Sequence, residues 1–536
     1  MTRAELIAER DELRRNLSES NARVQYLETQ VNWFKEQFKL ARHRQFGASS
    51  EKDFAVQNEL VFNEAEAVVD STPEVVETEE ISYTRKRKQA GHREQILADL
   101  PTETIEYRLP EEEQVCSQCG NHMHEMSTQT REEIEIIPAQ VKVTRHVRYV
   151  YGCRRCDKNG DSVPIVTAPA PKALIPKGLA SPSAVAYVIS QKYVEAMPLY
   201  RQEKHFGRMG VELSRQVISN WVIKGGEMLE PIYDRMHGLL LELDILHADE
   251  TRLQVLKEPG RSARTDSYMW LYRSGRHGPP IICYDYKEGR GGKYPVAFLP
   301  GFTGSLQVDG WHAYEDVKTA TLVGCWSHAR RKFCDAVLVV PKESRKDPTL
   351  LPNIAIKKIK DLYKIEREYH DVTPEERLAA RKERSEPIVD AFKEWMDRES
   401  PLVPPQSALG QAFTYCRNQW PKLKRFLDDG RLEIDNNRAE RSIKPFVIGR
   451  KNWLFANTPS GAKTSAIIYS IVETAKENGI NPFDYLKFVF ERIKSTDPAD
   501  HSAIDSLLPW SENVQAALRI RQSHAPTDTP HTVAPI

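Results

Sequence analysis

The sequence has no excess of charge of either sign and no long apolar run. Lysine plus arginine and aspartate plus glutamate each number 76, so the formal net charge is zero. No stretch approaches the roughly 18 apolar residues typical of a membrane-spanning helix, which argues against a membrane protein. The first residues are charged rather than apolar, so we expect no secretion signal and a cytoplasmic location.

Cysteine is also scarce, with 8 in 536 residues, which excludes a disulfide-stabilised scaffold. Four of the cysteines nevertheless form two Cys-x-x-Cys pairs. Each pair can place two thiolates on one side of a tight turn, and two such turns supply the closed tetrahedral ligand set of a structural Zn²⁺. The expected ligands are Cys116, Cys119, Cys153 and Cys156.

The 33 residues between the two pairs exceed the common ribbon spacing, so we expect a long hairpin with strands over residues 132–138 and 140–151. His122 and His124 are alternative ligands for the same ion. A redox role lacks the usual context of a Cys-x-x-Cys pair before a helix. The sequence therefore predicts a small zinc-binding β module over residues 111–165.

The neutral total hides strong local charge. Residues 64–80 carry seven acids and no base, and four consecutive bases follow at residues 85–88. Such a stretch repels itself and is typical of a linker, which we place at residues 46–110. The bases are either a solvated segment or a grip on phosphates.

The N-terminal segment, residues 1–45, has the heptad spacing of a coiled coil. From Leu6 to Phe38, eight of ten seam positions are apolar, and the segment contains no glycine or proline before residue 46. A coiled coil would make the protein a homo-oligomer through residues 1–40. The alternative is an amphipathic helix packed on its own domain.

Residues 175–235 resemble a helix-turn-helix. The first helix is expected to end near Gly207, the turn to include Gly210, and Ser214 to cap the second helix. That helix would present side chains able to pair with base edges, namely Arg215, Gln216 and Asn220. The alternative is a small helical bundle without a role in DNA recognition.

Residues 240–334 are rich in expected strands, and acids follow two of the most apolar ones. Asp249 and Asp309 each end an apolar run, so both carboxylates can project into a cleft from a fixed backbone. Oxygen ligands of this kind bind the hard divalent cations used in phosphoryl transfer. Glu440 is the best third ligand, on an expected helix. The competing acids are Asp244, Glu250, Asp316, Glu433 and Asp435.

Bases surround the third acid. Between residues 438 and 463 a single acid, Glu440, stands among six bases, as a DNA cleft requires. The bases are Arg438, Arg441, Lys444, Arg450, Lys451 and Lys463. Trp453 and Phe455 either stack on an unpaired base or belong to the core.

Several of these segments resemble one known family. His247–Thr251 (HADET), Val308–Tyr314 (VDGWHAY), Gly324–Phe333 (GCWSHARRKF) and Glu433–Phe455 (EIDNNRAERSIKPFVIGRKNWLF) are similar to motifs of the TnpC-type transposases of the insertion sequence 66 (IS66) family. Phe46–Lys52 (FGASSEK) and the double Cys-x-x-Cys module match the same family. The resemblance covers nearly the whole chain in the same order.

The resemblance implies a multidomain α+β protein with an RNase H-like α/β catalytic core. It places the Asp-Asp-Glu triad on Asp249, Asp309 and Glu440, with Mg²⁺ or Mn²⁺ as catalytic ion. Such an enzyme cleaves DNA at the element ends and joins them to target DNA. His328, Arg330 and Arg331 would line the cleft. Two small accessory proteins of the same element are also implied.

The core would consist of residues 240–334 and 431–460, interrupted by a helical insertion over residues 335–430. A C-terminal helical segment is expected over 461–496, and a loose tail, rich in Pro, Thr and His near its end, over 497–536.

Two other functions remain open from the residues alone. His328-Ala-Arg-Arg331 matches the His-x-x-Arg element of tyrosine recombinases, but a partner arginine motif and a following nucleophilic tyrosine are not evident. A non-enzymatic DNA-binding regulator would explain the coiled coil, the zinc module and the helix-turn-helix. It leaves the ordered acids of residues 240–460 unexplained, and metal-dependent cutting of a labelled DNA end would separate the two.

The first prediction concerns the zinc module. Metal analysis should find about one zinc per chain, and a Cys→Ser change at any of the four positions should lose it, because a closed tetrahedral site needs every ligand. Freshly purified protein without zinc would contradict the assignment.

Overall fold

The computed structural model describes residues 139–152, 165–176 and 178–518, and ten residues between Leu17 and Phe38. Residues from His146 to Arg519 fall within one compact unit. The four cysteines of the expected zinc site, the charged stretches of residues 64–88 and the end of the expected tail lie outside the described residues.

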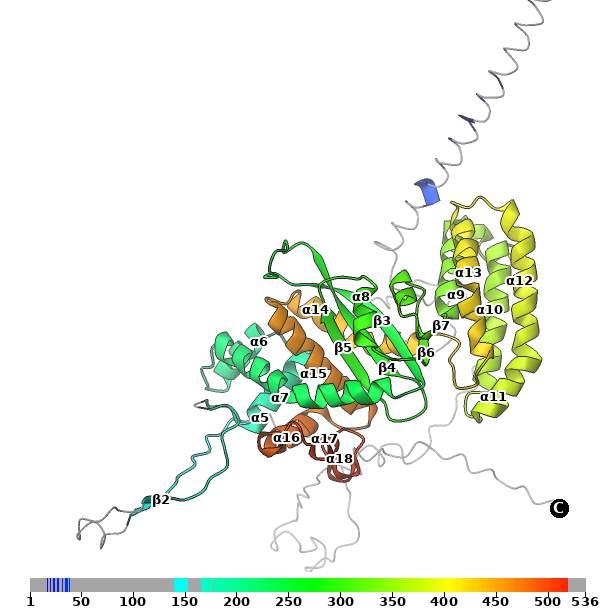
Figure 1. Ribbon diagram of the computed structural model, residues 1–536. Helices are drawn as coiled ribbons and strands as arrows, with labels where there is room; N and C mark the ends of the chain where they lie inside the picture. The colour runs from blue at the N-terminus through cyan, green and yellow to red at the C-terminus, as the bar shows by residue number, and fades with distance from the viewer. Residues whose placement is uncertain are drawn as a thin grey trace, which may run out of the picture. The chain divides into compact units, whose positions relative to one another are not determined.

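A five-stranded mixed sheet lies at the centre of this unit (Figure 1). The strand order is β5-β4-β3-β6-β7, with β4 antiparallel to both neighbours and β6 and β7 parallel to β3. All five strands lie within residues 240–334, the region expected to be rich in strands. The strands are β3 (Ile245–Gln254), β4 (Asp266–Ser274), β5 (Ile282–Lys287), β6 (Ser305–Gln307) and β7 (Thr321–Val323).

Helix α15 (Pro459–Glu477) closes the β5 edge of the sheet. The backbone N–H groups of Ile282 and Tyr284 donate to the hydroxyls of Thr474 (3.0 Å) and Ser470 (2.7 Å). The two hydroxyls are four residues apart, so they lie on one helix face and meet alternate backbone groups of the strand. An edge that would otherwise present unpaired donors is thereby satisfied.

Helix α7 (Arg215–Leu241) packs against α15, and two adjacent glycines allow the approach. A Cβ atom at Gly226 would lie 2.7 Å from the Thr464 side chain, and one at Gly225 would lie 2.8 Å from Ile189. Any larger residue would push α7 away from its neighbours. Helix α14 (Asn437–Trp453) packs on β3 and β4, and the short α8 (Lys293–Phe298) follows β5.

The two helices expected on either side of Gly210 are present. Helix α6 (Leu199–Arg208) follows α5 (Pro182–Tyr193), Gly210 takes a φ of +80° in the turn, and the Ser214 hydroxyl accepts from the backbone of Val217 at the start of α7. The second helix, α7, has 27 residues, which is much longer than a recognition helix needs to be. Its later turns are buried in the core. Val217, in the first turn of this helix, is 40% exposed.

The segment after β7 is a bundle of helices with its own aromatic core, as expected for residues 335–430 (Figure 1). Trp326 starts the first helix and packs edge-to-face on Phe392, with ring centroids 5.5 Å apart. The segment Trp326–Phe333, grouped above with the strands, is therefore helical. The bundle comprises α9 (Trp326–Val339), α10 (Leu351–Glu368), α11 (Pro374–Ala380), a π-helical turn (Arg381–Ser385), α12 (Glu386–Glu399) and α13 (Ala408–Lys424).

The structure differs from the sequence-based expectation in the zinc module. Residues 139–149, expected to be mostly strand, are irregular, and only β1 (Val150–Gly152) is extended. It pairs antiparallel with β2 (Ile165–Thr167), which follows the second cysteine pair. Strands β1 and β2 therefore lie on either side of the second Cys-x-x-Cys pair in the sequence, and residues 132–138, the other expected strand of the long hairpin, lie outside the described residues.

The tail also differs. Helix α16 (Pro482–Arg492) completes the expected C-terminal pair, but two short helices follow where a loose tail was expected, α17 (His501–Asp505) and α18 (Glu512–Leu518). Ile504, Leu507, Leu508 and Val514 are buried in the main core. These four buried side chains anchor the segment to the core, so the expectation of a loose tail is wrong for residues 497–518.

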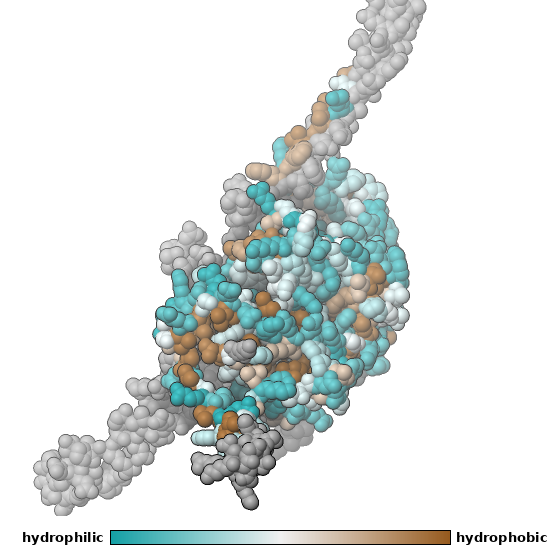
Figure 2. Space-filling view, turned by 60° about the vertical axis from the view of Figure 1, so that its left-hand side comes forward, coloured by the Kyte–Doolittle hydropathy of each residue, from teal (hydrophilic) through white to brown (hydrophobic). Residues whose placement is uncertain are grey.

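The surface of the described residues is mainly hydrophilic, with hydrophobic residues gathered in a few patches (Figure 2). None of the helices that the structure describes has both the length and the apolar character that a membrane crossing requires.

The described residues of the N-terminal segment are helical, and its seam is exposed. The side chains of Leu17, Val24, Leu27, Val31 and Phe38 are 48–70% exposed. Covering them in a second copy of the chain would remove apolar surface from water.

Deleting residues 1–40 should therefore lower the oligomeric state. Light scattering of the full chain and the truncated chain measures this directly. An unchanged molecular mass would show that the seam does not mediate self-association.

Candidate functional site

Three carboxylates converge where β3, β6 and α14 meet. Asp249 is the fifth residue of β3, so the strand continues past it instead of ending there. Asp309 lies two residues beyond β6, the parallel neighbour of β3, and Glu440 lies in the first turn of α14. The pKa of Asp249 is raised well above its usual value by burial and then by the negative charges of Glu250, Asp309 and Glu440.

Hydrogen bonds fix the loop of Asp309. Its Oδ1 accepts from the backbone N–H of Trp311 at 2.8 Å, and its carbonyl accepts from the Tyr415 hydroxyl at 2.6 Å. Gly310 takes a φ of +99°, and a Cβ there would press within 3.0 Å of Gln419. The glycine after Asp309 therefore serves both the turn and the approach of helix α13.

Glu440 lies beside a histidine and an arginine of helix α9. Its Oε1 is 3.5 Å from Nδ1 of His328, and its Oε2 is 3.4 Å from a guanidinium nitrogen of Arg331. Both Glu440 Oε1 and His328 Nδ1 are buried without a hydrogen-bond partner among the described residues. Burial lowers the pKa of His328, so the ring is available as a neutral ligand.

These orphaned atoms fit a divalent cation. One ligand atom each from Cys325, His328 and Glu440 lies within 4.8 Å of the others. Cys325 is a poor member of the set, because burial raises the pKa of its thiol and its sulfur already accepts from the Asn436 backbone at 3.2 Å. A carboxylate oxygen and an imidazole nitrogen remain, beside the carboxylates of Asp249 and Asp309.

Asn436 ties the start of α14 to β3. Its side-chain amide donates to the Ala248 carbonyl at 2.8 Å, and its Oδ1 lies 3.0 Å from Nδ1 of His247. Burial lowers the pKa of His247 to about 4, so the ring is neutral near pH 7 and its Nδ1–H donates to Asn436. Through these bonds the Asn436 amide orients the start of the helix that carries Glu440.

Four of the five competing acids are occupied by partners within the protein, all except Asp316, for which the structure gives no such bond among the described residues. Glu433 pairs with Arg438 at 2.9 Å, and Asp244 pairs with Arg431 at 2.8 Å. Asp435 accepts from the Tyr363 hydroxyl at 2.8 Å, and burial raises its pKa to about 6.

Glu250 is the competitor nearest to Asp249, and a network that the sequence did not reveal holds it. Arg290 donates to Glu250 at 2.7 Å, and the Tyr314 hydroxyl donates at 2.5 Å. The Arg290 guanidinium lies 3.7 Å from the ring centre of Trp311, whose indole donates to the Arg290 carbonyl. Because the Trp311 backbone also binds Asp309, the network braces the loop of one candidate ligand against the strand of the other.

The predicted DNA-contacting residues of α14 divide into two groups. Arg441 and Lys451 are exposed and Lys444 is half-buried. Arg438 instead forms the ion pair with Glu433, and Arg450 lies half-buried, donating to the Thr251 hydroxyl at 3.4 Å. These two residues stabilise the helix position, so their side chains are less available to phosphates.

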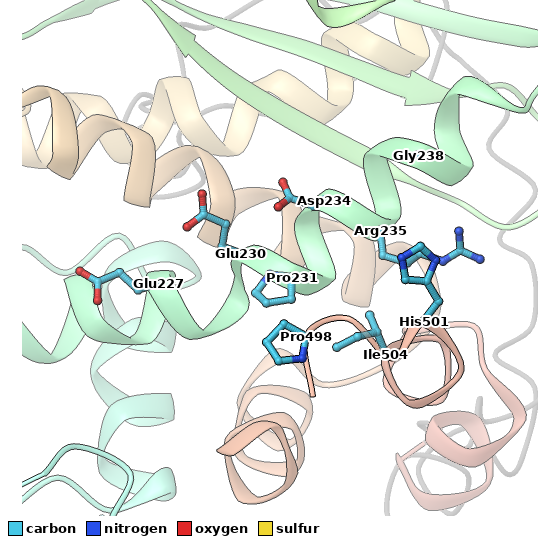
Figure 3. Close-up of a pocket in the computed structure, with 9 residues that line it drawn as sticks. All are labelled: Glu227, Glu230, Pro231, Asp234, Arg235, Gly238, Pro498, His501 and Ile504. Atoms are coloured by element: carbon cyan, nitrogen blue, oxygen red, sulfur yellow. The ribbon is translucent and has the colours of Figure 1, made fainter. Parts of the chain in front are cut away.

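In helix α7 the expected contact residues are exposed on the first turns. Arg215 pairs with Glu203 at 3.3 Å, and Gln216 and Asn220 are exposed. Farther along, α7 lines an acidic pocket of about 350 Å³ (Figure 3). Two of its acids are paired with lysines, Glu227 with Lys224 at 2.7 Å and Glu230 with Lys463 at 2.5 Å. The acids are Glu227, Glu230 and Asp234.

Four models of known protein families match segments of this chain. The model "Transposase IS66 family" matches residues 177–464, which include all three carboxylates. The "zinc-finger binding domain of transposase IS66" matches residues 113–157, which contain the four cysteines, and supports zinc binding. An "IS66 C-terminal element" matches residues 470–510, and a model described as "Transposase C of IS166 homeodomain" matches residues 33–105.

Two relatives from Sinorhizobium fredii (strain NBRC 101917 / NGR234) are similar over most of their length. The uncharacterized protein y4jD is 32% identical over 75% of this chain and 78% of the relative. The uncharacterized protein y4qI is 34% identical over 71% of this chain and 70% of the relative. Since one family model alone spans more than half of the sequence, the chain belongs to the IS66 family of transposases.

Proposed function

We propose that this transposase cuts and joins DNA at a divalent-cation site formed by Asp249, Asp309 and Glu440. The observation that carries the proposal is the convergence of three carboxylates from distant parts of the sequence, one of which has a buried oxygen with no hydrogen-bond partner among the described residues. Carboxylates that lie together repel one another when ionised, and a bound divalent cation would neutralise their charge.

The sheet supports an RNase H-like identity for the core. Three antiparallel strands are followed by two parallel ones in the order β5-β4-β3-β6-β7. The acids lie on β3, after its parallel neighbour β6, and on a helix packed against β3. The helical bundle enters between the second and third acids, as the family resemblance implies for an insertion.

Divalent cations bound at such a site neutralise charge on the attacking and leaving oxygens of an in-line displacement at phosphorus. Asp249 and Asp309 would hold the ion from rigid positions, and Glu440 with His328 would complete the ligand set. Hydrolysis at the element end leaves a 3′-hydroxyl. That hydroxyl then displaces a 3′-oxygen of target DNA, so one phosphodiester forms as another breaks.

The residues around the acids support DNA as the substrate. On α14, Lys444 and Lys451 follow Glu440 at spacings of 4 and 11 residues, which places all three on one helix face. A DNA strand whose phosphates bind these two lysines would bring a phosphate close to Glu440 at the start of the helix. The tyrosine recombinase alternative gains no support, because His328 and Arg331 of its motif contact Glu440.

The triad can be tested by removing one ligand charge at a time. Asp249→Asn, Asp309→Asn and Glu440→Gln should each reduce metal-dependent cutting of a labelled element end by at least about a thousandfold, because each keeps the side-chain size and removes a ligand charge. Binding of the same DNA should survive, since the basic face of α14 is unchanged.

Glu433→Gln and Asp435→Asn are matched controls, because both acids already have protein partners. Loss of cutting in one of these controls, with Glu440→Gln still active, would move the third ligand. Cutting retained in all three triad variants would refute the triad and favour the regulator.

The burial of Asp249, together with the repulsion from its neighbouring acids, predicts an effect on stability. Because the pKa of Asp249 is raised in the folded state, its ionised form destabilises the metal-free fold at neutral pH, and this penalty disappears as the pH falls toward its unfolded value near 4. Without added Mg²⁺ or Mn²⁺, Asp249→Asn should therefore raise the melting temperature at pH 7 by a few degrees, or about 1 kcal/mol.

The gain should shrink between pH 7 and pH 4, and Mn²⁺ should stabilise the wild-type chain but not the variant. The exposed Asp244, paired with Arg431, provides the control. An equal gain in Asp244→Asn, or none in Asp249→Asn, would show that the acids do not repel one another in the folded protein.

A further inference from the structure

The end of helix α14 has an unusual backbone. Leu454 takes φ +67° and ψ −52°, and the N–H of Phe455 donates to the carbonyl of Trp453 at 2.8 Å. This is the rare, strained form of the γ-turn, and a residue with a side chain in such a region costs on the order of 1–3 kcal/mol. Glycine would adopt the same turn with little strain.

The chain is held in this turn from both sides. The Leu454 N–H donates to the Arg450 carbonyl at 2.6 Å and closes the helix. Ala456 then pairs with the continuation of β3: its N–H donates to Gln254 at 2.9 Å and its carbonyl accepts from Leu256 at 3.0 Å. Only two residues separate the helix from this clamp, so the turn cannot relax.

The turn directs two apolar side chains outward. Leu454 is 63% exposed and Phe455 is 42% exposed. The preceding Trp453 packs inward, edge-to-face on Phe446 with ring centroids 5.5 Å apart. Packing in the core accounts for the presence of Trp453. It does not account for a leucine in a backbone conformation that suits glycine, or for the exposed phenylalanine that follows it.

The surroundings of the pair are basic. Lys451 lies one helical turn earlier, on the face that carries Glu440 and Lys444. Arg252, on β3 beside the clamp, pairs with Asp266 at 3.4 Å, and its side chain is 73% exposed. Lys257 donates its backbone N–H to Asn457 just after the turn. Apolar side chains among cations suit a polyanion with apolar interior faces, which describes the phosphates and stacked bases of DNA.

We propose that Leu454 and Phe455 form an apolar wedge that inserts between neighbouring bases of the bound DNA. The wedge rests on the proposed function, because it acts on the DNA that the triad cuts. Fourteen residues of helix separate Leu454 from Glu440, which corresponds to about 21 Å. At 3.4 Å per nucleotide along a strand, the wedge meets the DNA about six base pairs from the cut. Insertion there unstacks one base step and bends the duplex.

The experiment uses the full chain and a duplex carrying the element's terminal repeat, without added Mg²⁺ or Mn²⁺ so that the DNA stays uncut. The fluorescent base 2-aminopurine replaces single bases at positions one to ten on either side of the repeat's outer end. Binding should raise the fluorescence in one narrow region, about six positions from the end on one side. Leu454→Gly and Phe455→Ala should abolish this peak and weaken binding about tenfold.

Leu454→Gly also separates the wedge from a structural role, because its melting temperature should be equal to or above that of the wild-type chain while the peak is lost. Leu402→Ala, which truncates a leucine that is 76% exposed in the helical insertion, should leave the peak unchanged. A flat profile on bound DNA, or a peak that survives both wedge variants, would overturn the proposal. Failure of the wild-type chain to bind the repeat at all would refute the proposed function itself, and the wedge with it.

Discussion

The site depends on one buried amide, that of Asn436. The three acids repel one another, and each lies on a different element of the fold. The helix that carries Glu440 follows a bundle of about a hundred residues with a separate core. Asn436 joins the start of that helix to the Ala248 carbonyl and to the neutral His247 ring. These bonds are buried next to Asp249, so water cannot replace them, and they determine how closely Glu440 can approach Asp249.

Around this bridge the protein separates carboxylates into two kinds. Glu250 and Glu433 lie beside the candidate ligands, and each is neutralised by an arginine, Arg290 or Arg438. Among the residues that the structure describes, Asp249 accepts one hydrogen bond, from the backbone N–H of Glu250, and burial raises its pKa. The paired acids therefore add little net charge, and the uncompensated charge is concentrated where a cation would bind. Helix α14 also favours negative charge at this site, since Glu440 occupies its first turn, where the helix dipole stabilises an anion.

Local patterns predicted much of this arrangement. Apolar runs located all five strands, and Ser214 and Gly210 located the turn before α7, because these features depend on neighbouring residues alone. Arg290 carries no such pattern, and only the fold brings it to Glu250 and Trp311. The ordered segment of Ile504 and Val514 was missed for a similar reason: four buried apolar residues outweigh a polar, proline-containing composition, and the core that buries them is formed by distant elements.

Helix α14 is under constraint at both ends, and the two constraints have a common cause. At its start, packing on β3 forces Glu440 toward other carboxylates. At its end, pairing of Ala456 with the continuation of β3 leaves Leu454 in a strained turn. One strand therefore fixes the helix in both position and length. A protein selected for stability alone would carry glycine in place of Leu454 at this turn. A leucine kept there, on a helix that also carries Glu440 and two lysines, suits the proposed contact with DNA: an acid at the cut and an apolar contact at a fixed distance from it.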